Sequence, residues 1–429
     1  MTEIIEIFAR EILDSRGNPT VEVDVVLADG VEGRASVPSG ASTGKYESVE
    51  VRDKDLKRYS GKGVQKAING IREVISPEIC GIDVFEQDMI DRMMCHIDET
   101  ENKAMVGANA ILGVSLAVAQ AAASSLEMPL YRYLGGVQAC VLPVPLCSAI
   151  NGGFRVDNEL VVQELSLAPV GFDSFSEAIR GTSEVFHALK LVLREKGYYT
   201  ATADEGGYAP QISTIKEGFD LVLKAVEEVG YTPGQHFYLG VDCAASEFYN
   251  AKEKVYDLKG EKLKVGSDEL ASFYSKLIKN YPVIGIEDPF DQDDWEAWTK
   301  FSKAQSDIHV MGDDLFATDV RRIESGISKN AADTVVIKPN QIGTLTEALH
   351  ASRVAQRHGM TTVMAHRSGE TEDTFIADLC VATQSKLFKA GGLSPSERIA
   401  KYNQLLRIEE ALGEEAAYVG KLAIRGKSV

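Results

Sequence analysis

The second half of the chain repeats one pattern, in which a short apolar run ends in a single ionisable residue and an amphipathic stretch follows. The runs end at Asp242, Glu287, Asp313, Lys338, His366 and Lys389. The last five positions are spaced by about 23–28 residues, which is the length that one strand, one helix and their loops need in a (β/α)8 barrel. Continuous apolar runs suit strands that are buried on both faces. The pattern predicts an α/β fold with a modified (β/α)8, TIM-like barrel.

The residues before this repeat show a different pattern of apolar and polar positions. Alternating residues around the Asp29-Gly30 pair predict a β-hairpin within residues 20–37, and apolar positions at helical spacing predict helices after it. A linker of Gly, Pro and apolar residues comes next. We therefore expect an N-terminal α+β domain over residues 1–135 and a barrel domain over residues 140–429.

Composition argues against several classes of function. A net charge of −19 and a pI near 4.9 disfavour nucleic acid and anionic membranes as partners. The apolar stretch 107–125 carries polar residues and many alanines, which predicts a buried helix and not a membrane span. The six cysteines show no CxxC spacing, and the N-terminus does not resemble a signal peptide. These features predict a cytoplasmic protein with reduced thiols.

Three of the run-ending residues are carboxylates: Asp242, Glu287 and Asp313. Functional groups of barrels lie at the C-terminal ends of the strands, so these three are expected to converge on one mouth. Carboxylates without His or Cys form a hard oxygen site, which suits Mg²⁺ or Mn²⁺ better than Zn²⁺. For any one of them, capping the following helix is the alternative.

Two other run-ending residues are lysines, Lys338 and Lys389. Burial and a nearby metal ion would both lower the pKa of a lysine, and a lowered pKa makes lysine a usable general base. A salt bridge to one of the acids is the alternative.

A carboxylate pair, Glu164 and Glu205, forms a third candidate feature. Glu205 lies in the sequence DEGGY, where Gly206 and Gly207 permit a tight backbone path. Two carboxylates that share a site raise the pKa of one of them, which leaves a protonated general acid. A simple glycine-rich turn is the alternative for Glu205.

Two segments are candidates for holding an anion. Arg367 and Ser368, which follow His366, combine a guanidinium fork with a hydroxyl that suits phosphate or carboxylate. The loop Pro38–Glu47 is rich in Gly, Ser and Thr, so it could close over an anion and bring Ser39 to a metal. A flexible linker is the alternative for this loop.

Long motifs, distributed almost end to end, resemble the enolase (phosphopyruvate hydratase) family. They include DSRGNPTVEV, VPSGASTGKYE, DEGGYAP, IEDPFDQDDW, GDDLFAT, KPNQIGT, HRSGETEDTFIADL and SERIAKYNQLLRIEE. The resemblance implies a homodimer or higher homo-oligomer. It also implies the Mg²⁺-dependent, reversible dehydration of a small phosphorylated hydroxy acid, 2-phospho-D-glycerate, to phosphoenolpyruvate.

The resemblance also implies roles for individual residues. It implies two Mg²⁺ ions in each active site when substrate is bound, the first held by Asp242, Glu287 and Asp313 and the second reached by Ser39. Lys338 would take the C2 proton, and Glu205, supported by Glu164, would help the C3 hydroxyl to leave. The implied substrate contacts are Gln163, Arg367, Ser368, Lys389, His366 and Arg155.

The main departure from the family pattern is Arg155, which replaces a loop histidine that reaches the substrate. Ala365 and Ala390 also differ from the family's usual residues beside the pocket. One interpretation is drift in a working enolase, with Arg155 on the phosphate. Another is a paralogue that dehydrates a related or more anionic 2-hydroxy acid. A scaffold or binding role without catalysis is the third.

Overall fold

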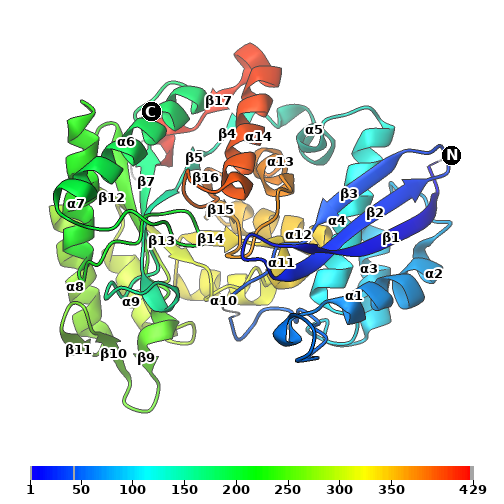
Figure 1. The fold of residues 1–429 in the computed structure, drawn as a ribbon, viewed down its shortest axis with the longest axis horizontal. Coiled ribbons are helices and arrows are strands. Elements are labelled where there is room, and N and C mark those ends of the chain that lie inside the picture. Colours follow the sequence, from blue (N-terminus) through cyan, green and yellow to red (C-terminus); the bar gives the residue numbers. More distant parts are fainter. Residues whose placement is uncertain (1, 42–43, 426–429) are drawn as a thin grey trace.

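The computed structural model describes residues 2–41 and 44–425, except the side chain of Arg155. Figure 1 shows an N-terminal sheet with helices beside a barrel. The N-terminal strands are antiparallel in the order β1 (Ile4–Leu13), β2 (Pro19–Leu27) and β3 (Glu32–Ser36). The helices of this part are α1 (Gln65–Gly70), η2 (Ile71–Ile75), α2 (Ser76–Ile79), α3 (Gln87–Asp98), α4 (Ala108–Ser125) and α5 (Leu130–Gly135).

The barrel sheet has nine strands in the order β5-β16-β15-β14-β13-β12-β8-β7-β6. Their bounds are β5 (Val144–Pro145), β6 (Cys147–Asn151), β7 (Glu164–Pro169), β8 (Phe237–Asp242), β12 (Val283–Glu287), β13 (His309–Gly312), β14 (Thr334–Ile337), β15 (Thr361–Ala365) and β16 (Leu387–Lys389). The two ends of this order, β5 and β6, are separated only by Leu146, so the sheet curves round until it is nearly closed. The predicted modified barrel with an N-terminal α+β part is confirmed.

One strand departs from the parallel barrel pattern. β7 runs antiparallel to both β6 and β8, whereas β8, β12, β13, β14, β15, β16 and β5 pair in parallel. Helices surround the sheet, as Figure 1 shows. They are α6 (Phe175–Glu195), α7 (Ile215–Glu228), α8 (Ser267–Asn280), α9 (Trp295–Ala304), α10 (Val320–Lys329), α11 (Pro339–Ile342), α12 (Leu345–Arg357), α13 (Phe375–Ala382) and α14 (Ser396–Leu412).

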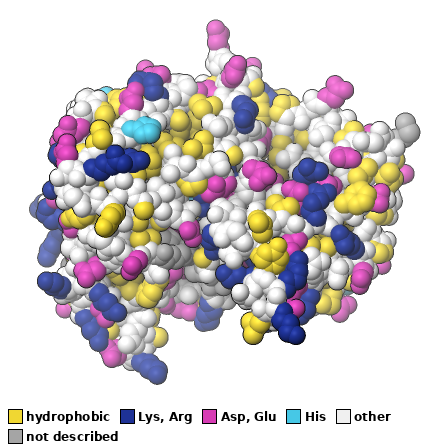
Figure 2. Space-filling view, in the orientation of Figure 1, with side chains coloured by type: hydrophobic (Ala, Val, Ile, Leu, Met, Phe, Trp, Pro, Cys, Tyr) yellow, Lys and Arg dark blue, Asp and Glu magenta, His cyan; other side chains and the backbone are white. Residues whose placement is uncertain are grey.

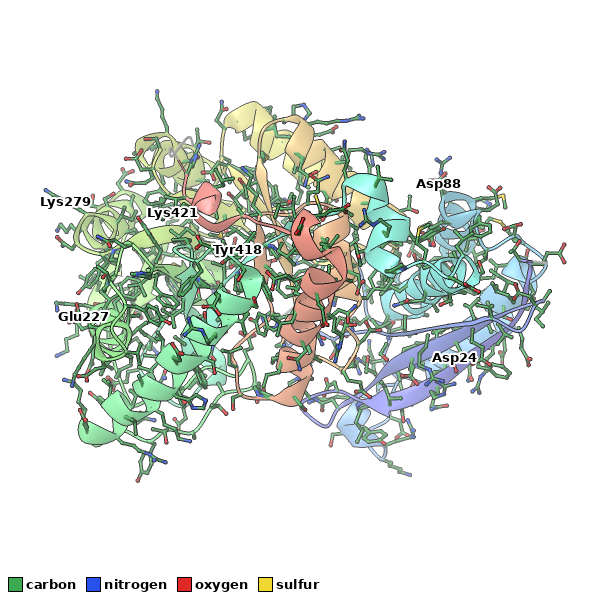
Figure 3. The ribbon with its side chains drawn as sticks, turned by 90° about the horizontal axis from the view of Figure 1, so that it is seen from above. Asp24, Asp88, Glu227, Lys279, Tyr418 and Lys421 are labelled. Atoms are coloured by element: carbon green, nitrogen blue, oxygen red, sulfur yellow. The ribbon has the colours of Figure 1, made fainter. Side chains whose placement is uncertain are left out.

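Two small sheets complete the strands. β4 (Val141–Leu142) pairs in parallel with β17 (Ala417–Tyr418), which ties the start of the barrel part to its end. β9 (Tyr249–Asn250), β10 (Val255–Leu258) and β11 (Leu263–Val265) form an antiparallel extension between β8 and α8. Seen from above in Figure 3, Asp24 and Asp88 lie toward one end of the molecule and Glu227 and Lys279 toward the other.

The hydrophobic core is shared between the two parts. One continuous cluster of buried apolar side chains includes residues from β1 to α14. A second, smaller cluster fills the barrel interior with residues such as Ile284, Val336 and Val363. Because the larger cluster crosses the expected boundary near residue 135, the division into two domains stays a prediction.

Helix α4 joins the N-terminal sheet to the barrel. It is the one described helix that is long and apolar enough to span a membrane, and 83% of it is buried inside the fold. A helix that is apolar on all sides packs in the core of a large protein. Its Ser115 hydroxyl accepts the backbone N–H of Leu345 at the start of α12, at 3.0 Å. This packing agrees with the predicted buried helix.

The surface carries charges of both signs. On the face shown in Figure 2, acidic and basic side chains are interspersed. Ion pairs between exposed side chains, such as Lys300 with Glu296 at 2.8 Å, contribute little to stability because water screens them. The fold therefore depends mainly on its apolar core.

We expect the change Gly33→Ala to destabilise the protein. A Cβ atom at Gly33 of β3 would lie 2.2 Å from the backbone nitrogen of Ala121 in α4, so the sheet would have to move away from the helix. Overpacking of this kind costs about 1–3 kcal/mol. The free energy of unfolding in urea measures the effect.

Gly266→Ala is the matched control, because the nearest atom to a Cβ there is 3.9 Å away. Its free energy of unfolding should change by less than about 1 kcal/mol, because the expected cost is that of alanine in place of glycine at the N-cap of α8. Equal stability of the two variants would contradict the close packing of β3 on α4.

Candidate active site

The carboxyl ends of six parallel strands meet at one mouth of the barrel. Asp242 and Glu287 are paired in the register of β8 and β12, and Lys389 ends β16 beside Ala365 of β15. Asp313, Lys338 and His366 directly follow β13, β14 and β15. Parallel strands place their C-terminal residues on one edge, as the sequence pattern predicted.

Glu164 reaches the same mouth by a different route. It is the first residue of β7, and β7 runs antiparallel to its neighbours. The start of β7 therefore lies where the other strands end, and Glu164 is paired with Asp242 on one side and Asn151 on the other. The preceding residue, Gln163, donates from Nε2 to Asp242 Oδ2 at 3.2 Å.

Lys389 lies between two of the expected metal ligands. Its Nζ donates to Asp242 Oδ2 at 2.6 Å and to Glu287 Oε2 at 2.8 Å, and all three side chains are buried. Burial would lower the pKa of Lys389, but these two carboxylates raise it well above its usual value. Burial and the neighbouring Asp242 raise the pKa of Glu287 to about 8. The salt-bridge alternative is thus realised for Lys389.

Lys338 forms a partly buried ion pair with Asp313, whose other oxygen accepts a hydrogen bond from Gln341 Nε2 at 2.9 Å. The expectation of a lowered lysine pKa is wrong for this arrangement. Burial does lower the pKa of Lys338, but the Asp313 carboxylate outweighs it, so the pKa is raised. Lys338 is therefore held as an ammonium by its partner carboxylate.

A carboxylate pair and a histidine form a second group. One atom each from Glu164, Glu205 and His366 lie within 4.8 Å of one another, and all three residues are buried. Burial raises the pKa of Glu164 to about 7, and the Glu205 carboxylate adds to the effect of burial. This agrees with the expectation that one member of the pair is easily protonated.

The DEGGY segment has the tight backbone path that the glycines predicted. Gly206 has a φ of +89°, and a Cβ there would lie 2.7 Å from Cδ of Pro395. The carbonyl of Glu205 accepts the backbone N–H of Gly392 at 2.7 Å. These contacts hold the loop that carries Glu205 against the segment after β16.

Arg367 is buried and paired with a carboxylate from the N-terminal loop. Its Nη1 lies 2.8 Å from Glu47 Oε2, and its Nη2 donates to Glu47 Oε1 at 3.2 Å. Nη1 also donates to Asn340 Oδ1 at 3.1 Å. The Ser368 hydroxyl accepts the backbone N–H of Ala41 at 2.8 Å, so the expected anion clamp also fastens the loop Pro38–Glu47 to the barrel.

Three described site residues, Ser39, Glu164 and Glu287, are not part of the lining of the central cavity. Ser39 is buried, and its Oγ accepts from Arg16 at 2.9 Å and donates to Asp14 at 3.0 Å. Its assignment as a metal ligand stays a prediction. The backbone of Arg155 lies in a short 3₁₀ turn, η4 (Gly153–Arg155), while its side chain lies outside the described part of the structure.

The converging side chains enclose a cavity of about 40 Å³. Its lining includes most expected site residues and several that the sequence interpretation left out: Glu47, Glu247, Asp288 and Asp314. Asp288 and Asp314 directly follow Glu287 and Asp313, so their adjacency to predicted ligands was an available signal. The Asp288 carboxylate accepts the backbone N–H groups of Asp313, at 2.9 Å, and Asp314, at 2.8 Å. Asp288 therefore orients the segment that carries Asp313.

The donor set fits a hard divalent cation. Glu287 Oε1 is buried and has no hydrogen-bond partner within the described ranges, and an orphaned buried carboxylate oxygen is costly. Asp242 and Asp313 add two further buried carboxylates. Oxygen donors without sulfur suit Mg²⁺ or Mn²⁺. Asp242, Glu287 and Asp313 stay the predicted ligands of such an ion, and Asp313 also forms a group with Asp288 and Asp314 in which one oxygen from each lies within 4.8 Å of the others.

Comparison with known families covers almost the whole chain. Residues 4–134 match the family model described as "Enolase, N-terminal domain", and residues 139–427 match "Enolase, C-terminal TIM barrel domain". The matches support a lyase with a dehydration chemistry of the enolase superfamily. They agree with the motifs and with the barrel mouth described above. This chain belongs to the enolase family.

Proposed function

We propose that this protein catalyses the Mg²⁺-dependent, reversible dehydration of 2-phospho-D-glycerate to phosphoenolpyruvate. The observation that carries the proposal is the arrangement of opposite chemistries around one buried cavity. The cavity lining includes both charged lysines and three of the acids: Lys338, Lys389, Asp242, Asp313 and Glu205. Glu287 adjoins this lining through its ion pair with Lys389, and Glu164 adjoins it beside Glu205.

The first step needs a base for the C2 proton of the substrate. That proton is weakly acidic because the neighbouring carboxylate is already charged. Mg²⁺ bound by Asp242, Glu287 and Asp313 would supply positive charge that stabilises the negative charge developing on that carboxylate. A lysine base combined with Mg²⁺ is the known pattern of the enolase superfamily.

Lys338 is proposed as the base, and its present ion pair indicates how its pKa is controlled. The Asp313 carboxylate is what raises the pKa of Lys338 against the effect of burial. If a cation also bound the Asp313 carboxylate, that carboxylate would raise the pKa of Lys338 less strongly. Burial would then lower the pKa of Lys338 toward the working range of a general base. Lys338 could then accept the C2 proton.

The second step needs an acid for the C3 hydroxyl. Glu205 is proposed as this acid, with Glu164 as its support, because the two buried carboxylates lie side by side and burial raises the pKa of Glu164 to about 7. Arg367, Ser368 and Lys389 supply cationic and hydroxyl donors for the anionic groups of the substrate. In this proposal the substrate phosphate competes with Glu47 for the Arg367 guanidinium. Gln163 and His366 are proposed further contacts from the cavity wall.

The remaining assignments are proposals as well. The enolase resemblance supports a homodimer or higher homo-oligomer, and free cysteines support a cytoplasmic location. A net charge of −19 supports a small-molecule substrate and neither nucleic acid nor an anionic membrane as partner. Against such a net charge, the substrate anion must be held by local cations such as Arg367.

We expect Glu287→Gln to weaken Mg²⁺ binding by at least about tenfold, because it replaces a charged oxygen ligand with a neutral amide. Isothermal titration calorimetry of the full chain with MgCl₂ measures this affinity. Glu296→Gln is the matched control, since Glu296 lies on the exposed start of α9 and pairs only with Lys300 among the described ion pairs. Unchanged Mg²⁺ affinity in Glu287→Gln would show that Glu287 is not a metal ligand.

A second experiment separates the base from the acid. Lys338→Ala should abolish exchange of the C2 proton of 2-phosphoglycerate with ²H₂O, because it removes the proposed acceptor. Glu205→Gln should lose dehydration but keep part of the C2 exchange, since proton removal precedes loss of the hydroxyl. NMR of the substrate follows both reactions.

Lys329→Ala is the control for the lysine, because Lys329 lies exposed at the end of α10 and donates to Ser325. C2 exchange at the parent rate in Lys338→Ala would show that another residue is the base.

A further inference from the structure

Arg398 is a completely buried arginine near the start of α14, and it has no role in the chemistry proposed above. Its guanidinium contacts two segments that carry site residues. Nη1 donates to the carbonyl of Arg367 and to Nδ1 of His366, both at 2.5 Å. Nη2 donates to the carbonyl of Ser368 at 2.6 Å and to that of Asp204 at 3.2 Å.

The contact with His366 determines where the proton of this ring lies. A guanidinium has only donors and stays charged in proteins. Nδ1 of His366 must therefore be the acceptor, and the single proton of the neutral ring lies on Nε2. A protonated ring would place an N–H group against the N–H group of Arg398. With the ring in this orientation, the donor-only guanidinium favours the tautomer that carries its proton on Nε2.

The charges around His366 oppose its protonation from several elements. Burial is the main cause that holds its pKa well below the usual value, and the next is Arg398 on α14. Lys389 at the end of β16, Lys338 after β14 and Lys401 on α14 act in the same direction. Glu164 and Glu205 are the acidic residues that face the ring, each with an oxygen within 4.8 Å of one ring nitrogen. Burial and the positive neighbours together favour the neutral form of the ring.

His366 also contributes to the active-site cavity. One of its ring nitrogens lies within 4.8 Å of Glu164 and Glu205 oxygens. Nδ1 is engaged by Arg398, which leaves Nε2 and its proton for other contacts. A neutral imidazole can polarise a substrate oxygen by donating a hydrogen bond without giving up its proton.

We infer that Arg398 is a positioning residue that keeps the proton of His366 on Nε2, so that His366 meets the substrate as a neutral N–H donor. The identity of that substrate rests on the proposed function, whereas the tautomer does not. Proton delivery then stays with the Glu164–Glu205 pair. The same guanidinium holds the carbonyls beside Glu205 and Ser368, so it fixes the donor and its neighbours together.

The tautomer is tested directly by NMR of ¹⁵N-histidine-labelled full-length protein. The chain has seven histidines, and the spectrum of His366→Gln identifies the signals of this ring. We expect a neutral ring with the proton on Nε2 throughout about pH 6 to 8. An Nδ1–H tautomer, or an imidazolium in this range, would overturn the inference. This result does not depend on whether 2-phosphoglycerate is turned over.

Variants of Arg398 test the functional consequence. Arg398→Met removes the donor, so His366 should populate both tautomers, and kcat should fall about 100-fold. The KM should change less than about threefold, because the substrate anion is held elsewhere. Arg398→Lys restores a cationic donor and should recover the Nε2–H tautomer and part of kcat. If Arg398 had only a structural role, Arg398→Met would lower the stability of the protein and leave the His366 tautomer unchanged.

Arg353→Gln, on the exposed side of α12, is the matched control and should leave the tautomer and kcat unchanged. An unaltered tautomer in folded Arg398→Met, or a mixed tautomer in Arg398→Lys, would contradict the inference. If Arg398→Met does not fold, the spectra of the parent protein and of Arg398→Lys decide the question.

Discussion

The constraint on which this site depends is the electrostatic balance of carboxylates buried at one barrel mouth. A buried carboxylate without a partner costs several kcal/mol, so each must meet a cation, a hydrogen-bond donor or a proton. Lys389 offsets Asp242 and Glu287, and Lys338 offsets Asp313. Burial raises the pKa of Glu164 to about 7 even though Lys389 acts in the opposite direction, so a proton on Glu164 contributes to the balance. The orphaned Glu287 oxygen shows that the balance is incomplete.

This balance connects the fold to the proposed chemistry. The parallel strands bring the acids together, and the reversed β7 adds Glu164 to the same edge. Cations from other segments then hold the acids in place. A ligand that binds one member of an ion pair also changes the pKa of the other member. On this account, Mg²⁺ and substrate bind by replacing ion pairs that the site residues make with one another. The pair between Glu47 and Arg367 is one example.

The sequence allowed the barrel and much of its mouth to be predicted because the relevant signal is local. Each apolar run ends in the residue that lies at the mouth, so Asp242 and Lys389 could be identified without knowledge of the contacts. Pairings across long sequence separations could not be predicted. Glu47 engages Arg367 from a segment 320 residues away, and no periodicity encodes that contact. The raised pKa of Lys338 has the same origin, since it depends on a pairing with Asp313 between neighbouring strands.

The central claim is that this mouth dehydrates 2-phosphoglycerate with the help of a divalent cation. The most direct measurement is the ultraviolet absorbance of the enol product when the full chain is mixed with 2-phosphoglycerate and MgCl₂. The account predicts product formation that stops when the cation is chelated and resumes when Mg²⁺ is restored. Tight Mg²⁺ binding without any turnover of 2-phosphoglycerate would contradict it.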